Sequence, residues 1–221
     1  MESIALHPSE PSSLPPLSSA TLGWEHLRVE QCQYPPGEAT CGEEEDHTIY
    51  LSLASRPIRL LQIQAGKTYS GLYSKGDFSI TPAKTPIFAR WEGVDHYLQI
   101  RIADRFVQRV AQESLSMNVD RLEFLSEFRV RDPHLESIAM LLLAELKPDH
   151  LGGKLYIESL ANVLAVHLLR HYAATKPRLP VYEGGLPERH LLQVLDYIHD
   201  HLDQEIKLAD LAALLNMSQF H

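Results

Sequence analysis

Two histidines and a tryptophan are the side chains whose spacing best suits contact with a small molecule. His47 precedes the alternating apolar residues of segment 49–53, and His96 precedes those of segment 98–102. Alternate residues of a strand point to one face of a sheet, so the pattern predicts that both histidines line a barrel interior with Trp91. An imidazole there can hold a ligand or exchange a proton. A satisfied structural histidine is the alternative interpretation.

Tyr69 and Arg90 are weaker candidates for contacts to the same molecule. The predicted ligand-binding set is therefore His47, Tyr69, Arg90, Trp91 and His96. No residue in this set is assigned a catalytic role.

Neither a metal site nor a catalytic site is predicted from the remaining motifs. His167 and His171 are four residues apart, as zinc ligands on a helix can be, but no third ligand is spaced to complete a site. We expect them at a solvent-facing edge. Cys32 and Cys41 form no paired motif and are expected to be free thiols of a cytosolic protein. Because no nucleophile elbow, glycine-rich phosphate loop or H-E-x-x-H pattern occurs, the chain is predicted to be neither an enzyme nor dependent on a cofactor.

The elements that must position these residues change type at Asp104. From Trp24 to Ile102, short apolar runs alternate with turn signals, which predicts an all-β barrel or sandwich. A helical period follows Asp104, and a further helix is predicted to start at Asp132 as N-cap with Pro133 in its first turn. The next helix is expected over 154–172, packed on its predecessor as a hairpin. Its broad apolar stripe fits either self-association or internal core.

Composition and charge limit the class of protein. Residues 1–20 are rich in proline and serine and are expected to be disordered. Hydrophobic residues make up 44% of the chain and charged residues 22%, without a long apolar run or basic leader, which indicates a globular cytoplasmic protein with no membrane partner. The net charge of −9 is wrong for a self-sufficient nucleic-acid binder.

A family resemblance begins after the predicted linker at 176–186. The segment LPERHLLQVLDYIHDHLDQEIKLADLAALLNMSQFH resembles the opening of the DNA-binding domain of AraC/XylS regulators. The resemblance implies that Ser218 begins a recognition helix, with Gln219 and His221 near the DNA. Lys207 stands where members commonly have a capping serine or threonine, and it completes the predicted DNA-binding set. Only the first turn of the recognition helix is present, so the resemblance places most of the basic, DNA-reading part beyond His221.

An earlier segment resembles the sensor domain found in many members of that family. GDFSITPAKTP, residues 76–86, is similar to the turn of a cupin-like barrel. The chain departs from metal-binding cupins because no H-x-H occurs in the barrel region and Ile87 stands where a histidine is expected. The predicted fold class is α+β: a cupin-like barrel with a C-terminal helical hairpin over 21–175, then an incomplete all-α helix-turn-helix domain over 187–221.

The resemblance also implies a function. We expect a sequence-specific transcription regulator whose barrel binds an unknown small-molecule effector and forms a homodimer on duplex DNA at promoter half-sites, with RNA polymerase as a further candidate partner. Two alternatives stay open. One is a metal-dependent cupin-type enzyme with an incidental helical tail, and the other is a naturally truncated, dimerising antagonist of a full-length regulator.

Overall fold

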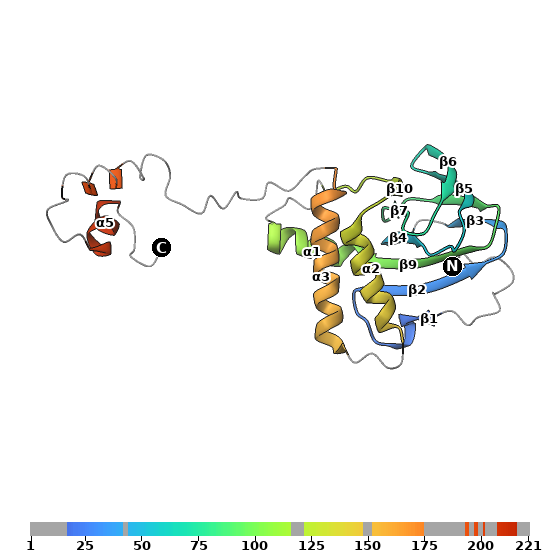
Figure 1. Cartoon of the computed structure of the whole chain (residues 1–221), viewed down its shortest axis with the longest axis horizontal. Helices are drawn as coiled ribbons and strands as arrows, with labels where there is room; N and C mark the ends of the chain where they lie inside the picture. Colours follow the sequence, from blue (N-terminus) through green and yellow to red (C-terminus); the bar gives the residue numbers. More distant parts are fainter. Residues whose placement is uncertain are drawn as a thin grey trace. The chain divides into compact units, whose positions relative to one another are not determined.

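The chain divides into two compact units, Met1–Pro177 and Arg178–His221 (Figure 1). In the first unit, the computed structural model describes residues 17–41, 44–115, 122–147 and 152–174. In the second it describes 193–194, 197–198, 201 and 207–215.

The described part of the first unit contains two antiparallel sheets. The larger has the strand order β1-β2-β9-β4-β7-β10, and the smaller has the order β3-β8-β5-β6. The strands are β1 (Leu17–Ser18), β2 (Leu27–Tyr34), β3 (Gly37–Cys41), β4 (Asp46–Ser52), β5 (Ile58–Gln64), β6 (Lys67–Tyr73), β7 (Phe78–Thr81), β8 (Ile87–Trp91), β9 (Asp95–Ala103) and β10 (Glu127–Val130). The predicted strand-rich region before Asp104 is therefore present.

Helices cover one face of the larger sheet. After the short 3-10 helix η1 (Ser19–Thr21) come α1 (Asp104–Leu115), α2 (Pro133–Glu145) and α3 (Gly153–His171). Figure 1 shows α1, α2 and α3 beside the strands β9, β4 and β2. None of the helices in the described ranges combines the length and the apolar character needed to cross a bilayer.

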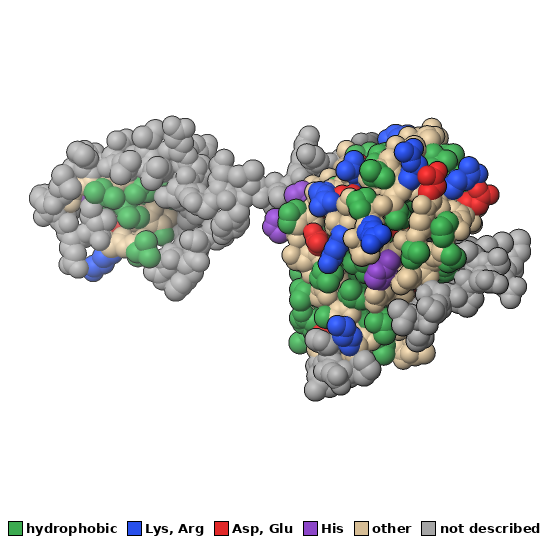
Figure 2. All heavy atoms as spheres, turned by 45° about the vertical axis from the view of Figure 1, so that its right-hand side comes forward, with side chains coloured by type: hydrophobic (Ala, Val, Ile, Leu, Met, Phe, Trp, Pro, Cys, Tyr) green, Lys and Arg blue, Asp and Glu red, His purple; other side chains and the backbone are tan. Residues whose placement is uncertain are grey.

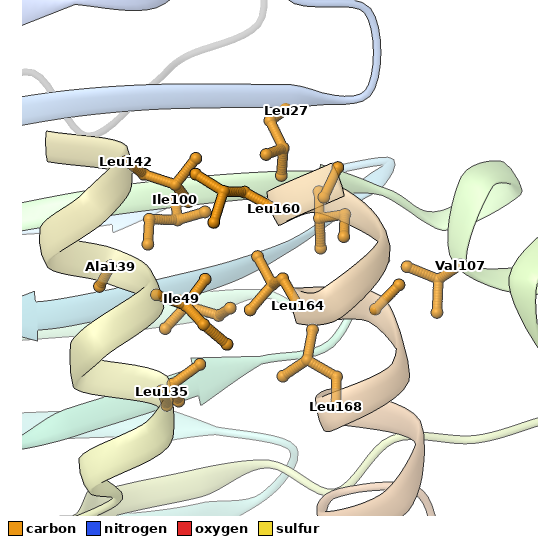
Figure 3. Close-up of a cluster of buried hydrophobic side chains, with 14 of the residues drawn as sticks. Leu27, Ile49, Ile100, Val107, Leu135, Ala139, Leu142, Leu160, Leu164 and Leu168 are labelled. Carbon is orange, nitrogen blue, oxygen red and sulfur yellow. The ribbon is translucent and has the colours of Figure 1, made fainter. Parts of the chain in front are cut away.

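The main core lies between these helices and the sheet. Ile49, on β4, and Ile100, on β9, are paired across the sheet and point into the core, where they meet Leu142, Leu160 and Leu164 (Figure 3). Along β4 and β9, Ile49 and Ile100 alternate with residues that face the opposite side of the sheet, as the two-residue period of a strand requires. Full burial of such side chains contributes roughly 1.5–3 kcal/mol each, so this layer is the main source of stability.

The turn before β7 is fixed by a glycine and a buried carboxylate. Gly76 has φ +85°, a conformation that side chains with a Cβ rarely adopt. The next residue, Asp77, is 1% exposed and accepts hydrogen bonds from the Ser74 backbone N–H and from Arg131 Nε, both at 2.7 Å. Part of the segment that resembles a cupin-like turn therefore has a structural role, which is to link β7 to the start of α2.

The predicted start of α2 is confirmed. Asp132 is the N-cap, and its Oδ1 accepts hydrogen bonds from the backbone N–H groups of His134 (3.0 Å) and Leu135 (3.1 Å). Its other carboxylate oxygen bonds to His167 Nε2 (2.6 Å) and accepts from the Tyr172 hydroxyl (2.8 Å). One carboxylate thus connects the beginning of α2 to the end of α3.

This contact corrects the expected position of His167. Its side chain is 12% exposed, whereas His171 is exposed at the predicted edge. The carboxylate that holds His167 comes from a residue 35 positions earlier. Sequence spacing within one helix does not show such a contact, because the packing of α2 on α3 creates it.

The N-terminal segment also needs a correction, since residues 17–20 belong to the fold. Leu17 pairs with Gln31 as β1 joins β2, and the buried Ser19 hydroxyl accepts a hydrogen bond from the Val29 backbone N–H at 2.9 Å. A serine-rich composition predicts disorder because serine buries little apolar surface, but Ser19 satisfies a strand backbone instead. Predicted disorder over 1–16 and the predicted linker at 176–186 lie outside the described residues.

In the second unit, α5 (Leu208–Leu214) is formed where the sequence predicts a helix. Lys207 is its N-cap and provides no side-chain cap, as expected of an ammonium group. Instead, the carboxylate of Asp210 accepts a hydrogen bond from the Lys207 backbone N–H at 3.0 Å. Ser218, Gln219 and His221 lie outside the described residues.

Candidate ligand cavity

A cavity lies between the two sheets, on the side of the larger sheet opposite the helices. Five aromatic side chains line it together with four polar ones; they are Tyr34, Tyr50, Tyr73, Trp91 and Tyr97, and Ser52, Gln62, Ser79 and Asp95. The space between the side chains measures about 570 Å³ out to its open mouth, but the part that admits water is about 40 Å³. Because one water needs roughly 10–15 Å³ by that measure, there is room for about three.

The strand register explains why these residues meet. Tyr50 of β4 pairs with Ser79 of β7 and with Gln99 of β9, and Ser52 pairs with Tyr97. These residues alternate along their strands with the aliphatic residues of the main core. The same strands therefore present one aliphatic face to the helices and one aromatic, polar face to the smaller sheet.

The tyrosines pack against one another at the larger sheet. The rings of Tyr34 and Tyr97 have centroids 6.1 Å apart, and Tyr50 meets Tyr97 edge to face at 5.7 Å. Burial raises the pKa of Tyr34 to about 12, and it raises the pKa values of Tyr50 and Tyr97 as well, so all three phenols are neutral near pH 7. Trp91 is held in place because its Nε1–H donates to the Pro35 carbonyl.

Most polar groups on the other side of the cavity are satisfied internally. The Tyr73 hydroxyl donates to Gln62 Oε1 (2.7 Å), and Gln62 Nε2 donates to Ser79 Oγ (3.2 Å). The same phenol accepts a hydrogen bond from the Arg129 backbone N–H at 2.8 Å. This chain of bonds fixes the orientation of three cavity side chains.

Two polar groups of the cavity lack such partners. Asp95, at the start of β9, has no hydrogen-bond or ion-pair partner among the described residues. Burial raises the pKa of its carboxyl group to about 7. The buried Ser52 hydroxyl also has no hydrogen-bond partner within the described part of the chain. Asp95 is half-buried and Ser52 is buried, and a polar group that loses water without gaining a partner costs free energy, so this pair is the unusual feature of the cavity.

Of the five predicted ligand-binding residues, the structure brings only Trp91 into the cavity lining. Tyr69 lies next to it, edge to face with Tyr73 at a centroid distance of 5.6 Å. Arg90 lies on the outer face of the smaller sheet, where its half-exposed side chain pairs with Glu38 at 2.6 Å.

The expected position of His47 in the barrel interior is wrong. The Ala83 backbone N–H donates to Nδ1 (3.0 Å), so Nε2 carries the proton and donates to Asp104 Oδ1 (2.9 Å). The ring packs on Phe124 with centroids 4.5 Å apart. Burial lowers the pKa of His47 although Asp104 opposes this effect, so the imidazole is a neutral structural group on the helix side.

His96 is also outside the cavity lining. Its Nε2 accepts a hydrogen bond from the Gln31 side-chain amide at 2.8 Å, and it shares the face of Leu98. Both predictions took the apolar face of each strand for the barrel interior, but helices cover that face. The signal that locates the cavity is the opposite set of alternate positions, Tyr50 and Ser52 on β4 and Asp95 and Tyr97 on β9.

Metal binding finds no support in the described ranges. No three His, Cys, Asp or Glu side chains there are grouped as ligands of a metal ion. Neither Cys32 nor Cys41 forms a disulfide in the described part of the chain, and burial raises the pKa of Cys32 to about 11.

Comparison with known proteins identifies no family. No protein-family model matches the sequence, and no curated protein matches it. Among solved structures, the chain is similar to the AraC-like transcriptional activator CuxR with a TM-score of 0.48 and 9% identity, over 90% of this chain and 69% of that one.

Enzymes are also among the similar structures. A Streptomyces albus protein, HEPD, with Fe(II) bound has a TM-score of 0.30 and 18% identity over 35% of this chain and 18% of its own. Salicylate 1,2-dioxygenase from Pseudoaminobacter salicylatoxidans has the same score and identity over 35% and 22%. All these TM-scores are below 0.5, too low for any of these similarities to indicate a function.

Proposed function

We propose that the first unit binds a small molecule in the cavity and acts as the sensor of an AraC-type transcription regulator. The observation that supports ligand binding is the unpaired Asp95 carboxylate beside the unpaired Ser52 hydroxyl, in a cavity walled by aromatic rings. A concave apolar site with a few convergent polar groups and a perturbed pKa is the usual form of a small-molecule site.

The energetics of Asp95 favour a binding role over a structural one. A structural carboxylate is normally paired, as Asp77 and Asp132 are in this protein. Asp95 instead reduces stability wherever it is ionised, because it leaves water without gaining a partner. A ligand that supplies the missing donor would recover that free energy.

The regulatory part of the proposal rests on sequence resemblance. Residues 186–221 resemble the start of an AraC-type DNA-binding domain, and α5 forms where that resemblance requires a helix. We infer a cytoplasmic homodimer that binds duplex DNA at promoter half-sites and acts on RNA polymerase. Ligand binding would shift this dimer between two arrangements.

The outer surfaces of α2 and α3 are our candidate dimer surface. They expose Met140, Leu141, Leu155 and Val163, each at least 41% accessible. Figure 2 shows one face of the first unit, on which Lys and Arg side chains are interspersed with acidic, histidine and hydrophobic ones. Light scattering after size exclusion tests the dimer: we expect a dimeric mass that Leu155→Asp reduces to monomer, while Arg90→Asp does not. A monomeric mass for the unaltered protein would refute this surface.

Thermal denaturation in the presence of a metabolite library tests the ligand-binding part. A true ligand should raise the unfolding midpoint in proportion to the logarithm of its concentration. The increase should disappear in Trp91→Ala and persist in Arg90→Ala, whose side chain lies on the outer face. If every stabilising compound still acted on the Trp91 variant, the cavity would not be the site.

DNA binding is tested on the protein encoded by the whole gene. We expect it to bind its own promoter region with an affinity that falls steeply with salt, as phosphate contacts require. An affinity independent of salt would contradict the regulator proposal and leave the ligand-binding proposal standing.

A further inference from the structure

We infer that the cavity selects a small organic cation, a protonated or quaternary amine held between the Asp95 carboxylate and the surrounding aromatic rings. This inference rests on the proposed small-molecule function and narrows it to one chemical class. Three features of the cavity carry it: the sign of its charge, its size and the placement of its unpaired acceptors.

The formal charge on the described residues that line the cavity is negative. Asp95 is the only acidic or basic side chain among the described residues that line the cavity, which include no Lys, Arg or His. Aromatic rings add to this preference, because their faces carry negative partial charge and attract cations. An anion would meet a carboxylate without a compensating cation, so carboxylates and phosphates are disfavoured.

The unpaired acceptors are close in register. Ser52 on β4 lies opposite Tyr97 on β9, and Asp95 is two residues from Tyr97 on the same face. The two groups are therefore diagonal neighbours on adjacent strands. A protonated amine carries several N–H donors, so it can donate to the Asp95 carboxylate and to the Ser52 hydroxyl oxygen at once while its charge balances Asp95. A quaternary amine has no N–H donor and would be held by its charge and the aromatic rings alone. A neutral alcohol has one O–H donor and no charge to balance the carboxylate.

The size of the cavity restricts the amine. Space for about three waters corresponds to a ligand of roughly five non-hydrogen atoms, if the side chains stay in place. Tert-butylammonium and tetramethylammonium fall in this range. Tert-butanol has the shape of the first without its charge, and trimethylacetate carries the opposite charge.

Protonation of Asp95 should control the affinity. The titratable groups facing it are Cys32 and Tyr34 from β2, Tyr50 from β4 and Tyr97 from its own strand. All four are neutral near pH 7 because burial raises their pKa values. Tyr73, across the cavity, is neutral for the same reason. Asp95 is then the lining group that changes charge near neutrality, since its pKa lies at about 7. Cation binding requires the ionised form and should release a proton at lower pH.

Calorimetric titration of the 221-residue protein at pH 8 tests the inference with these four probes. We expect tert-butylammonium to bind at least about tenfold more tightly than tert-butanol, and trimethylacetate not to bind. Between pH 8 and pH 6 the dissociation constant of the cation should rise by about tenfold, with proton release at the lower pH.

Asp95→Asn is the decisive variant. It should fold, because it removes a carboxylate charge that destabilises the protein when the cavity is empty. We expect it to weaken tert-butylammonium binding by roughly tenfold to a hundredfold and to abolish the pH dependence. Glu92→Gln is the matched control, since this exposed residue lies outside the lining and loses the same charge. It should bind the cation as the unaltered protein does.

The outcomes separate the two proposals. Equal or tighter binding of tert-butanol, or cation binding that Asp95→Asn leaves unchanged, overturns the cation assignment while the proposed ligand-binding function stands. Failure of both cations to bind also overturns the assignment. If the metabolite library also leaves the unfolding midpoint unchanged, the proposed function fails as well.

Discussion

The two faces of the larger sheet differ in almost every physical respect, although the same strands build both. On the helix side, Ile49 and Ile100 lie in an aliphatic layer with Leu164, and all three are fully buried. On the inner side, Tyr50 and Tyr97 border a cavity. Side chains of α1, α2 and α3 pack closely against the first face. The second face borders empty space and carries two polar groups without hydrogen-bond partners among the described residues.

The helix-side face increases the stability of the fold, whereas the cavity-side face decreases it. Close packing of aliphatic groups contributes dispersion and hydrophobic free energy without requiring hydrogen bonds. The inner face holds a half-buried carboxylate and a buried hydroxyl without partners among the described residues, which lowers stability. Sites that bind ligands commonly carry such costs, because a site satisfied by the protein alone has little to offer a ligand.

The largest effect should come from opening the aliphatic layer. Leu164→Ala removes a side chain with 0% exposure at the centre of α3, and we expect a loss of about 3 kcal/mol in unfolding free energy, measured in urea. Leu72→Ala, the same change at a 51% exposed side chain on β6, should cost less than about 0.5 kcal/mol. Equal losses for the two variants would mean that the layer is not closely packed.

A change on the inner face should have the opposite sign. Asp95 binds its proton more tightly in the folded state, because its pKa rises from 3.8 to about 7 on burial. The ionised side chain therefore destabilises the fold progressively as pH rises from about 4 to 7. Asp95→Asn should increase the unfolding free energy by on the order of 3 kcal/mol at pH 8 and leave it nearly unchanged at pH 4.

Urea denaturation at the two pH values measures this gain, with Glu92→Gln as the control for loss of one negative charge. That control should change stability little, since its ion pair with Arg59 is exposed at 3.6 Å. Destabilisation by Asp95→Asn at pH 8 would show that the carboxylate has a partner, and the contrast between the faces would be lost.

A paired carboxylate on the helix side gives the next effect. Burial works against ionisation of Asp132, but hydrogen bonds from His167, the Leu135 N–H and Tyr172 prevail and lower its pKa from 3.8 to about 2. Asp132→Ala should cost about 2 kcal/mol at pH 7, because the helix cap and both side-chain contacts are removed. Asp132→Asn can keep the cap and should cost less.

The pH dependence provides the check on Asp132. A lowered carboxyl pKa stabilises the fold above about pH 4, and this contribution is lost as pH falls toward 2. Thermal melts of the unaltered protein and Asp132→Ala should therefore converge over that range. A constant difference between their melting temperatures would show that ionisation of Asp132 does not contribute.

The smallest effect concerns His47. Burial lowers the pKa of this imidazole below 6.5, so the unfolded chain takes up the proton more readily and stability falls as pH drops below 6.5. His47→Gln should reduce the slope of stability against pH between 7 and 5, measured by chemical denaturation. The variant should leave tert-butylammonium binding unchanged, and a loss of that binding would return His47 to the ligand site.

Much of the fold could be predicted from local sequence signals. The strand region, the change to helix at Asp104 and the cap at Asp132 each depend on residues close in sequence, and the structure confirms them. Residues 17–20 were missed because their serines satisfy a strand backbone that lies ten or more positions away.

The site could be predicted only in part. Strand periodicity correctly divides residues 46–52 and 95–103 into two faces, because alternation is a property of the strand itself. It does not say which face a helix covers and which a second sheet covers. His47 and His96 were assigned to the interior for that reason, and Trp91 was placed correctly because its strand belongs to the smaller sheet.

By itself, then, the sequence determined which residues share a face and where strands give way to helices. Both are set by backbone geometry over a few residues. Only the tertiary structure decided that the polar, aromatic face encloses the cavity. It alone shows that Asp95 has no hydrogen-bond or ion-pair partner among the described residues. The packing of α1, α2 and α3 against one face, and of a second sheet against the other, depends on contacts between residues far apart in the chain.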